Sequence, residues 1–438
     1  MKNEPIDALI KPLSQFIRSE SNAGIVLFIS AVIALVWANS GWAHAYHALW
    51  HQEFSISIAD YSISNTFHHW INDGLMAMFF FVVGLEIKYE IIAGNLSSPK
   101  QAILPLVAAI GGMALPALLF MLFNSQAPES RGWGIPMATD IAFSLGLLSL
   151  LGKRVPIALK VFLTALAIAD DLGAVLVIAF FYTSDISLAS LGYSAVFIAI
   201  LIGANLMGIR STVFYGIVGI GGLWLAFLLS GVHATIAGVL AALIIPGRTK
   251  INEVEFTKKL KDLVNEFIAI PPNDVTLLEP QQVHTLDKIK NLTRAADTPL
   301  QRLEHNMHPF VAFVIMPLFA LANAGIEFTS DFANDLLHPV SLGVAAGLLF
   351  GKFTGITGTT FLMVRLKLAK LPEQLTWRHI IGVGFIAGIG FTMSLFIANL
   401  AFSDNELNLV SRTGVLIGSL ISGVVGFLIL RAARSNDP

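Results

Sequence analysis

The stretch LTALAIADDLGAVLVIAFF, residues 163–181, decides the class of fold. Apart from Asp170 and Asp171, almost every side chain in it is apolar, and about 20 apolar residues in a helix cross the roughly 30 Å hydrocarbon core of a bilayer. A helix satisfies its own backbone hydrogen bonds in lipid, whereas a barrel strand would alternate over about ten residues. The stretch therefore predicts a transmembrane helix with two acidic residues near its middle.

The composition of the whole chain also favours a membrane protein. Of its 438 residues, 55% are hydrophobic and 13% are charged, which is too apolar for ordinary soluble domains. The formal net charge of −2 gives no general attraction to nucleic acid. Because the chain contains no cysteine, disulfides, thiolate metal sites and thiol nucleophiles are excluded, and nothing in the sequence implies a cofactor.

Similar apolar runs recur along the chain, about twelve in all. They lie near residues 23–40, 68–92, 102–123, 132–152, 157–182, 188–207, 211–229, 232–246, 309–326, 339–364, 379–402 and 408–431. We therefore expect an all-α membrane protein in which residues 1–438 form a single polytopic domain.

Basic residues are distributed unevenly between the loops. The tails and one set of alternate loops hold most of them, including Lys100, Lys153, Arg154, Arg210, Arg365, Lys367, Lys370, Arg378, Arg431 and Arg434. The opposite loops hold only Arg131 and Arg412. Since Lys and Arg accumulate in cytoplasmic loops, we expect both termini in the cytoplasm and the protein in a bacterial inner (plasma) membrane.

Two segments are expected outside the bilayer. Residues 51–64 carry Phe54, Ile56 and Ile58 at a two-residue period, which favours a short external hairpin, although an ordered loop without a special role is an equal alternative. Residues 247–308 form a cytoplasmic linker, in which KKLKDLVNEF indicates one amphipathic helix and IPPND an interruption.

Ionisable side chains inside the spans are the first candidates for function, because each costs at least ~2.5 to 3.5 kcal/mol near the middle of a bilayer. The candidates are Asp73, Glu86, Asp140, Asp170, Asp171 and Lys352. Asp170 and Asp171 are too deep to reach an interface, and two like charges in one partly dry site lose their protons in coupled steps. A hard cation such as sodium prefers the same oxygens, so the pair predicts competition between cation and protons. The alternative is a packing pair tied to the backbone or to Lys352.

Lys352 lies near the middle of its span and needs an acidic partner. It is either a charge partner that changes contacts during transport or a static ion pair that braces two helices, and both alternatives place it close to residues 157–182.

Two spans contain interruptions. Gly132, Gly134 and Pro136 precede Thr139 and Asp140 in one span, and GVGFIAGIGFT carries four glycines in the range 379–402. Paired broken helices in the two halves of a transporter point to its binding site. Asp140 is expected beside the converging N-termini of the broken helices and Lys352 beside the converging C-termini. Thr139 offers a hydroxyl ligand or only a backbone hydrogen bond.

Other polar residues lie near the ends of the spans. Asp73 is either functional or a hydrated cap, and Glu86 belongs either to a charged rim or to a funnel that concentrates cations. His308 and Glu304 form a candidate pH-responsive cluster, whereas His233 starts a span and could simply cap it.

The strings INDGLMAMFFFVVGLEIKYE, ATDIAF, ADDLGAV, GVHATIAG, RLEHNMHPFV, PLFALANAG, GLLFGK and GFIAGIGFTMSLFIA, in this order, resemble the NhaA-type bacterial sodium/proton antiporters. The resemblance covers nearly the whole chain. It implies an ion antiporter and not an enzyme, with inverted repeats formed by helices 3 to 5 and 10 to 12 and with helices 4 and 11 interrupted. The string with Glu86 departs from the usual pattern at Tyr89, where arginine is common, and Gln301 stands where lysine often precedes RLEH.

The resemblance also implies roles for single residues. Asp170 and Asp171 become the cation and proton site, Lys352 and Asp140 compensate charge and helix dipoles, and Lys352 is also a partner of Asp170. Thr139, Asp73, Glu86, His233, Glu304 and His308 match positions linked to transport or to pH response. Electrogenic exchange of two protons for one sodium or lithium ion, regulation by pH and a homodimer joined through the external hairpin are further implications.

A sodium-coupled symporter of a small solute is the nearest alternative function. A passive channel usually needs rings of carboxylates from symmetric subunits, and an intramembrane aspartyl protease usually takes its two aspartates from separate helices. Two adjacent acids opposed by one lysine fit both of these less well.

Overall fold

The computed structural model describes Phe16 and residues 20–58, 61–183, 187–271, 277–328 and 331–433. Within these ranges the chain is helical apart from one pair of strands, so the expected all-α membrane protein is confirmed. Six described helices are each long and apolar enough to cross a membrane, and three pairs bent by more than 40° pass the same test as pairs.

Every apolar range expected from the sequence falls on a helical segment. In chain order these are α2 (Glu20–Ala38); α4, η1 and α5 (Phe67–His69, Trp70–Leu75, Met76–Ile92); α6 (Pro99–Phe123); η2 and α7 (Glu129–Met137, Ile141–Leu150); α8 (Ile157–Phe181); α9 (Leu188–Leu206); α10, η4 and α11 (Thr212–Tyr215, Gly216–Leu223, Trp224–Leu228); α12 (Ala234–Ile244); α15, η5 and α16 (Pro299–Phe310, Val311–Ile315, Met316–Asn323); α18, η6 and α19 (Pro339–Ala346, Gly347–Gly351, Lys352–Arg365); α20 and α21 (Trp377–Ile386, Phe391–Ala401); and α22 (Asn405–Ala432). Short helices α3 (Ala43–His51), η3 (Gly152–Arg154) and α17 (Phe332–Leu337) lie in the connections.

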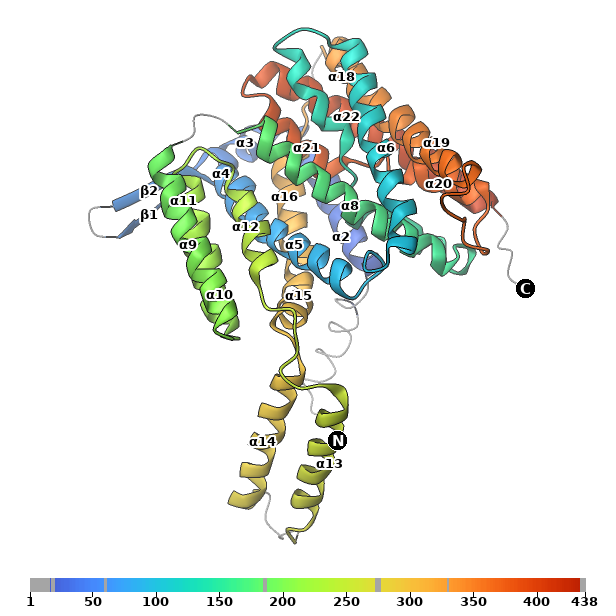
Figure 1. Ribbon diagram of the computed structural model, residues 1–438. Coiled ribbons are helices and arrows are strands. Elements are labelled where there is room, and N and C mark those ends of the chain that lie inside the picture. The colour runs from blue at the N-terminus through green and yellow to red at the C-terminus, as the bar shows by residue number, and fades with distance from the viewer. Residues whose placement is uncertain are drawn as a thin grey trace.

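The strands mark one side of the molecule. β1 (Glu53–Ile58) pairs with β2 (Tyr61–Thr66) in an antiparallel register that begins with Glu53 opposite Thr66. The helices α2 and α3 meet at 113°, so α3 turns away from the span instead of continuing it. We call the side on which β1 and β2 connect α3 to α4 the strand side (Figure 1).

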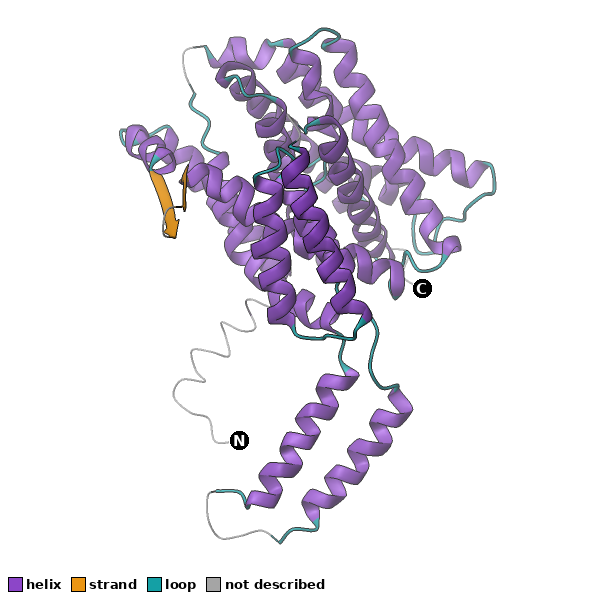
Figure 2. Cartoon of the chain, turned by 60° about the vertical axis from the view of Figure 1, so that its left-hand side comes forward, coloured by secondary structure: helices purple, strands orange, loops and turns teal. Residues whose placement is uncertain are grey.

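A pair of helices projects from the packed spans, at the bottom of Figure 1 and away from the strands. The helices α13 (Glu253–Ile268) and α14 (Pro280–Ala296) lie side by side and extend away from the packed spans (Figures 1 and 2). Lys288 on α14 contacts Glu266 on α13 at 2.8 Å. We call this the hairpin side. The sequence predicted one amphipathic helix in the linker 247–308, and the structure adds a second.

The span with His308 begins earlier than expected. Its first helix, α15, starts at Pro299 and not near residue 309. The Thr298 side chain accepts the Gln301 amide, and Pro299 occupies the first turn, where its missing N–H costs nothing. Glu304 and His308 therefore lie within a helix.

Small residues let the spans approach closely. A side chain at Gly355 of α19 would lie 2.2 Å from the Gly111 carbonyl of α6, and one at Gly238 of α12 would lie 2.3 Å from the Ala77 carbonyl of α5. Helices in lipid associate through such close packing because lipid supplies no hydrophobic driving force between them. These contacts join α6 to α19 and α5 to α12, the two most extensive helix pairs.

Candidate ion-binding site

Two broken spans cross near the middle of the molecule. The axes of η2 and α7 differ by 41° around residues 138–140, and those of α20 and α21 by 44° around residues 387–390. Broken helices leave backbone groups without partners inside the bilayer region. The candidate site lies at the crossing, where these backbone groups find hydrogen-bond partners.

Each break satisfies the backbone of the other. The Thr139 hydroxyl donates to the Ala387 carbonyl at 2.8 Å, and the Asp140 amide donates to the Ile389 carbonyl at 2.7 Å. Two more hydroxyls bridge the same crossing, from Ser144 to Ile386 and from Ser394 to Ile135. The crossing is therefore held by hydrogen bonds between segments about 250 positions apart in the sequence.

The carboxylate of Asp140 caps two helices at once. One oxygen accepts the Phe143 amide of α7 at 2.9 Å, and the other accepts the Thr392 amide of α21 at 3.1 Å and the Thr392 hydroxyl. The side chain of Asp140 is completely buried. Each helix N-terminus carries about half a positive charge, so one carboxylate lies where two such ends converge.

The second element of the site is a buried ion pair. Lys352, the first residue of α19, contacts Asp170 of α8 at 2.5 Å, and both side chains have 0% exposure. The other oxygen of Asp170 has no hydrogen-bond partner among the described residues. The pair joins α19 to α8, and the expected place of Lys352 beside converging C-termini stays a prediction.

Asp171 lies next to this pair but faces a cavity. Its side chain is 1% exposed, and neither carboxylate oxygen has a hydrogen-bond partner within the described chain. The cavity that it lines, together with Asp140, has a volume of about 270 Å³. Buried polar atoms normally have partners, so these oxygens are placed to accept a proton or a small hard cation.

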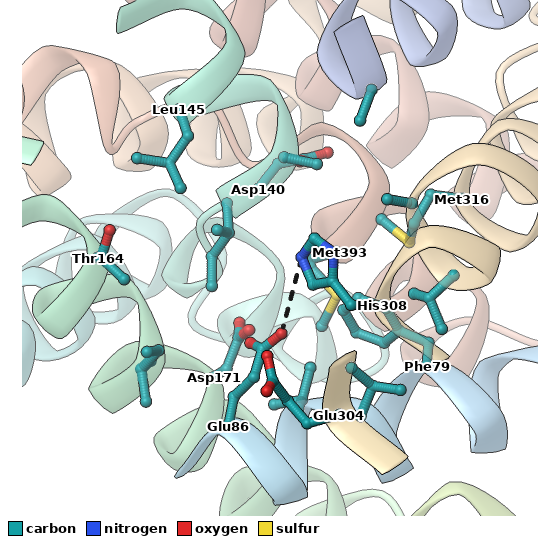
Figure 3. Close-up of a pocket in the computed structure, with 18 of the residues that line it drawn as sticks. Phe79, Glu86, Asp140, Leu145, Thr164, Asp171, Glu304, His308, Met316 and Met393 are labelled. Atoms are coloured by element: carbon teal, nitrogen blue, oxygen red, sulfur yellow. Dashed lines mark ion pairs between the residues drawn. The ribbon is translucent and has the colours of Figure 1, made fainter. Parts of the chain in front are cut away.

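The cavity leads from Asp171 toward residues of the hairpin side. Glu86, Glu304 and His308 line it, and the carboxylates of Glu86 and Glu304 lie together with that of Asp171 in Figure 3. The dashed line there marks the 3.9 Å contact between His308 and Glu86. Glu86 also lies within electrostatic range of Asp171.

Two of the predicted residues lie elsewhere. Asp73 in η1 contacts His69 at 3.0 Å and lies within electrostatic range of His233. The His233 ring hydrogen-bonds the Tyr182 carbonyl at 2.6 Å. Neither Asp73 nor His233 lines the cavity that holds Asp171, so the structure places them in a second polar group.

Several contributors to the crossing were not predicted. The Thr392 hydroxyl donates to the Asp140 carboxylate, and the Ser394 hydroxyl donates to the Ile135 carbonyl. The Ser419 hydroxyl accepts the amides of Gly390 and Phe391 at 3.2 Å each. Thr392 and Ser394 lie in the first turns of α21, whose N-cap is Gly390, and nothing in the sequence shows which groups their hydroxyls reach.

Broken helices that cross beside buried, ionisable side chains at the end of a cavity define a secondary transporter of ions, and not an enzyme. The model for the family described as "Na+/H+ antiporter 1" matches residues 14–430. The chain therefore belongs to the NhaA-type sodium/proton antiporter family, and the expected family resemblance is confirmed.

Individual relatives match over nearly their whole length. An Na(+)/H(+) antiporter NhaA of Oleidesulfovibrio alaskensis is 47% identical over 99% of this chain and 97% of its own. Those of Sulfurimonas denitrificans and Koribacter versatilis are 47% and 46% identical over 97% of this chain and over 96% and 92% of their own lengths. Sodium and protons are thus the transported ions of the family, and the chain is a multi-pass bacterial membrane protein.

Proposed function

We propose that this protein exchanges cytoplasmic sodium, or lithium, for external protons, with Asp170 and Asp171 binding the cation and the protons alternately. The observation that carries the proposal is Asp171, a buried carboxylate at the end of the cavity that has no hydrogen-bond partner among the described residues. An ionised carboxylate there is costly unless a cation or a proton neutralises it. A bound proton and a bound cation then exclude each other.

Lys352 is the charge partner in this scheme. When a cation is bound, both aspartates supply oxygen ligands and Lys352 moves away from Asp170. Lys352, buried and without an acidic partner in that state, gives up its proton. When the cation leaves, Lys352 takes up a proton and returns to Asp170, and Asp171 takes up a second proton, which is the state closest to the described ion pair. Asp140 and Thr139 hold the crossing of the broken helices in place.

We propose that each cycle moves two protons against one cation. Such a cycle transfers one net charge, so a membrane potential drives it with ~2.3 kcal/mol per 100 mV. The ratio of proton flux to sodium flux in liposomes should therefore be two.

The orientation follows from the charged loops. The basic residues of the tails and of the helical pair α13–α14 support a cytoplasmic hairpin side and an external strand side in a bacterial inner membrane. The cavity that reaches Asp171 from Glu86 and Glu304 then opens toward the cytoplasm, where sodium is collected.

We further propose that Glu86, Glu304 and His308 adjust transport to pH. These groups line the cavity, and histidine changes charge between about pH 5 and 8. Asp73 and His233, in the second polar group, are accessory residues of transport and pH response in this proposal.

A homodimer through the strands completes the proposal. The sheet has only two strands, β1 and β2, and an isolated two-stranded hairpin is marginal in water. Pairing with the hairpin of a second copy would cover its open edges.

Everted membrane vesicles test the proposal. Asp171→Asn and Asp170→Asn should each abolish sodium-dependent dequenching of a pH-sensitive dye, while Asp287→Asn on the exposed face of α14 is the matched control. Exchange retained in both site variants would reject the assignment. Purified protein in liposomes without an organic solute separates this proposal from sodium–solute symport, because a symporter would move no protons against sodium there.

A further inference from the structure

Between the aspartates and the strand side, three spans carry the same order of side chains. From the strand side inward, each of the spans that contain α5, α16 and α21 carries an asparagine first, then a phenylalanine, and then a residue that lines the cavity of Asp171. The amides are Asn72 (in η1, directly before α5), Asn323 and Asn399; the rings are Phe80, Phe319 and Phe396; the lining residues are Val83, Met316 and Met393.

The amides form a connected layer. Asn323 donates to the Asn72 side-chain oxygen at 3.1 Å and accepts from Asn399 at 2.7 Å. His68 hydrogen-bonds the same Asn323 oxygen at 3.1 Å, and Arg412 of α22 donates to the Asn323 backbone carbonyl at the end of α16. This amide layer, Asn72, Asn323 and Asn399, therefore joins three spans on the strand side.

The rings form a second layer below the amides. Phe396 lies with its ring centre 5.5 Å from that of Phe80 and 6.3 Å from that of Phe319. All three side chains are at most 1% exposed. A cluster of packed aromatic rings excludes water and ions, so this phenyl layer, Phe80, Phe319 and Phe396, seals the interior from the amides above it.

The third layer belongs to the cavity of Asp171. Val83, Met316 and Met393 line that cavity directly, one turn beyond the phenyl layer on each span. The path from the strand side to Asp171 is thus blocked by two layers of side chains from α5 (with η1), α16 and α21.

We propose that the amide layer and the phenyl layer are the closed gate of the second access route to Asp171, and that breaking the amide hydrogen bonds admits ions from the strand side. A transporter that works by alternating access needs such a route, because its site opens to each side in turn. The inference depends on the proposed exchange in one respect, namely that an exchanger requires a second access route. Amides suit a gate that opens repeatedly, since water replaces their hydrogen bonds when they separate, at a small net cost.

Cysteine labelling tests the gate without measuring transport. The natural chain has no cysteine, so Met76→Cys introduces a single thiol. Met76 is 0% exposed and lies one turn from Asn72 toward Phe80. A membrane-impermeant maleimide is added to intact cells that carry Met76→Cys alone or with Asn399→Ala.

Asn399→Ala removes two hydrogen bonds, to Asn323 at 2.7 Å and from Asn408 at 3.1 Å. Loss of the one that closes the gate should raise the labelling rate about two- to ten-fold. The matched control is Asn124→Ala, because Asn124 also bridges two spans on the strand side, through the Pro339 carbonyl at 3.0 Å, but it lies outside the gate. It should leave the labelling rate unchanged. If Asn399→Ala lowers the amount of protein in the membrane, Asn399→Ser is measured in its place.

Equal labelling rates in the parent and the Asn399 variants would overturn the gate. An equal increase of the labelling rate in Asn124→Ala and Asn399→Ala would also overturn it. Labelling that increases only in everted vesicles would also overturn it, because the reagent would then arrive through the cavity of Asp171. The labelling assay tests the gate and the exchange assay with Asp171→Asn tests the ion site, so failure of one proposal can be told from failure of the other.

Discussion

Asp140 and Thr392, 252 positions apart in the sequence, share a hydrogen bond between a carboxylate oxygen and a backbone amide at 3.1 Å. Through it, the residue that begins α7 also caps α21. The crossing of the two broken spans thus depends on one side chain, and this dependence can be measured.

Replacing Asp140 should lower thermal stability by more than an ordinary cap does. Asp140→Ala leaves the Phe143 and Thr392 amides without acceptors, and each lost cap costs about 1 kcal/mol. We expect about 2 kcal/mol in all, with Asp140→Asn in between, from melting of the purified protein. Asp404→Ala, which removes a single exposed cap at the start of α22, is the control. Equal losses in Asp140→Ala and Asp404→Ala would contradict the double cap.

The ion pair of Asp170 and Lys352 should show strong coupling. Lys352→Met leaves a buried carboxylate without its cation, which costs about 3 to 5 kcal/mol. Adding Asp170→Asn removes that charge, so the double variant should be more stable than Lys352→Met alone. Melting temperatures of the four proteins in this cycle give the coupling. Strictly additive losses would mean that the two side chains do not interact in solution.

His308 should limit exchange at acidic pH. When protonated, it adds positive charge at the cavity beside Glu86, 3.9 Å away, and repels sodium. His308→Gln should therefore extend exchange to lower pH, measured as dye dequenching across pH in everted vesicles. His284→Gln on the exposed face of α14 is the matched control. A pH profile that moves equally in both variants, or in neither, argues against a role for His308.

The helical pair α13–α14 should loosen in acid. The hydrogen bond from Lys288 lowers the pKa of Glu266 below its ordinary value. The ionised carboxyl is therefore favoured in the folded pair, so its contribution to stability is present above the ordinary pKa of a glutamate, about 4.3, and is lost as the pH falls through the lowered pKa. Hydrogen–deuterium exchange of α13 and α14 should change with pH more in the parent than in Glu266→Gln. The same pH dependence in both proteins would remove Glu266 as its cause.

Much of the fold could be predicted because lipid imposes simple rules on sequence. A span must be apolar for about 20 residues, and each apolar range found by this requirement falls on a helical segment. The same rule drew attention to Asp140, Asp170, Asp171 and Lys352, since charges in lipid are costly. That Lys352 needs an acidic partner followed from this cost, whereas its pairing with Asp170 came from the family resemblance.

Other parts left no local signal in the sequence. The helix α14 is polar almost throughout and depends on its contact with α13, as in the bond between Thr285 and Glu266. The Thr392 hydroxyl bonds the Asp140 carboxylate and the Ser419 hydroxyl bonds the Gly390 and Phe391 amides, and only the three-dimensional structure shows that these groups lie close together. The amide layer likewise combines residues from three distant spans, each of which resembles an ordinary polar residue near a helix end.

The reciprocal bonding of the two breaks also constrains how the protein is made. While a ribosome is still synthesising the first half of the chain, Asp140 has only the Phe143 amide to bind, because Thr392 does not yet exist. The Thr139 hydroxyl likewise waits for Ala387. The ion site is therefore completed near the end of biosynthesis, and a chain truncated before α20 leaves the Asp140 amide and the Thr139 hydroxyl without the carbonyls that they bond in the complete chain.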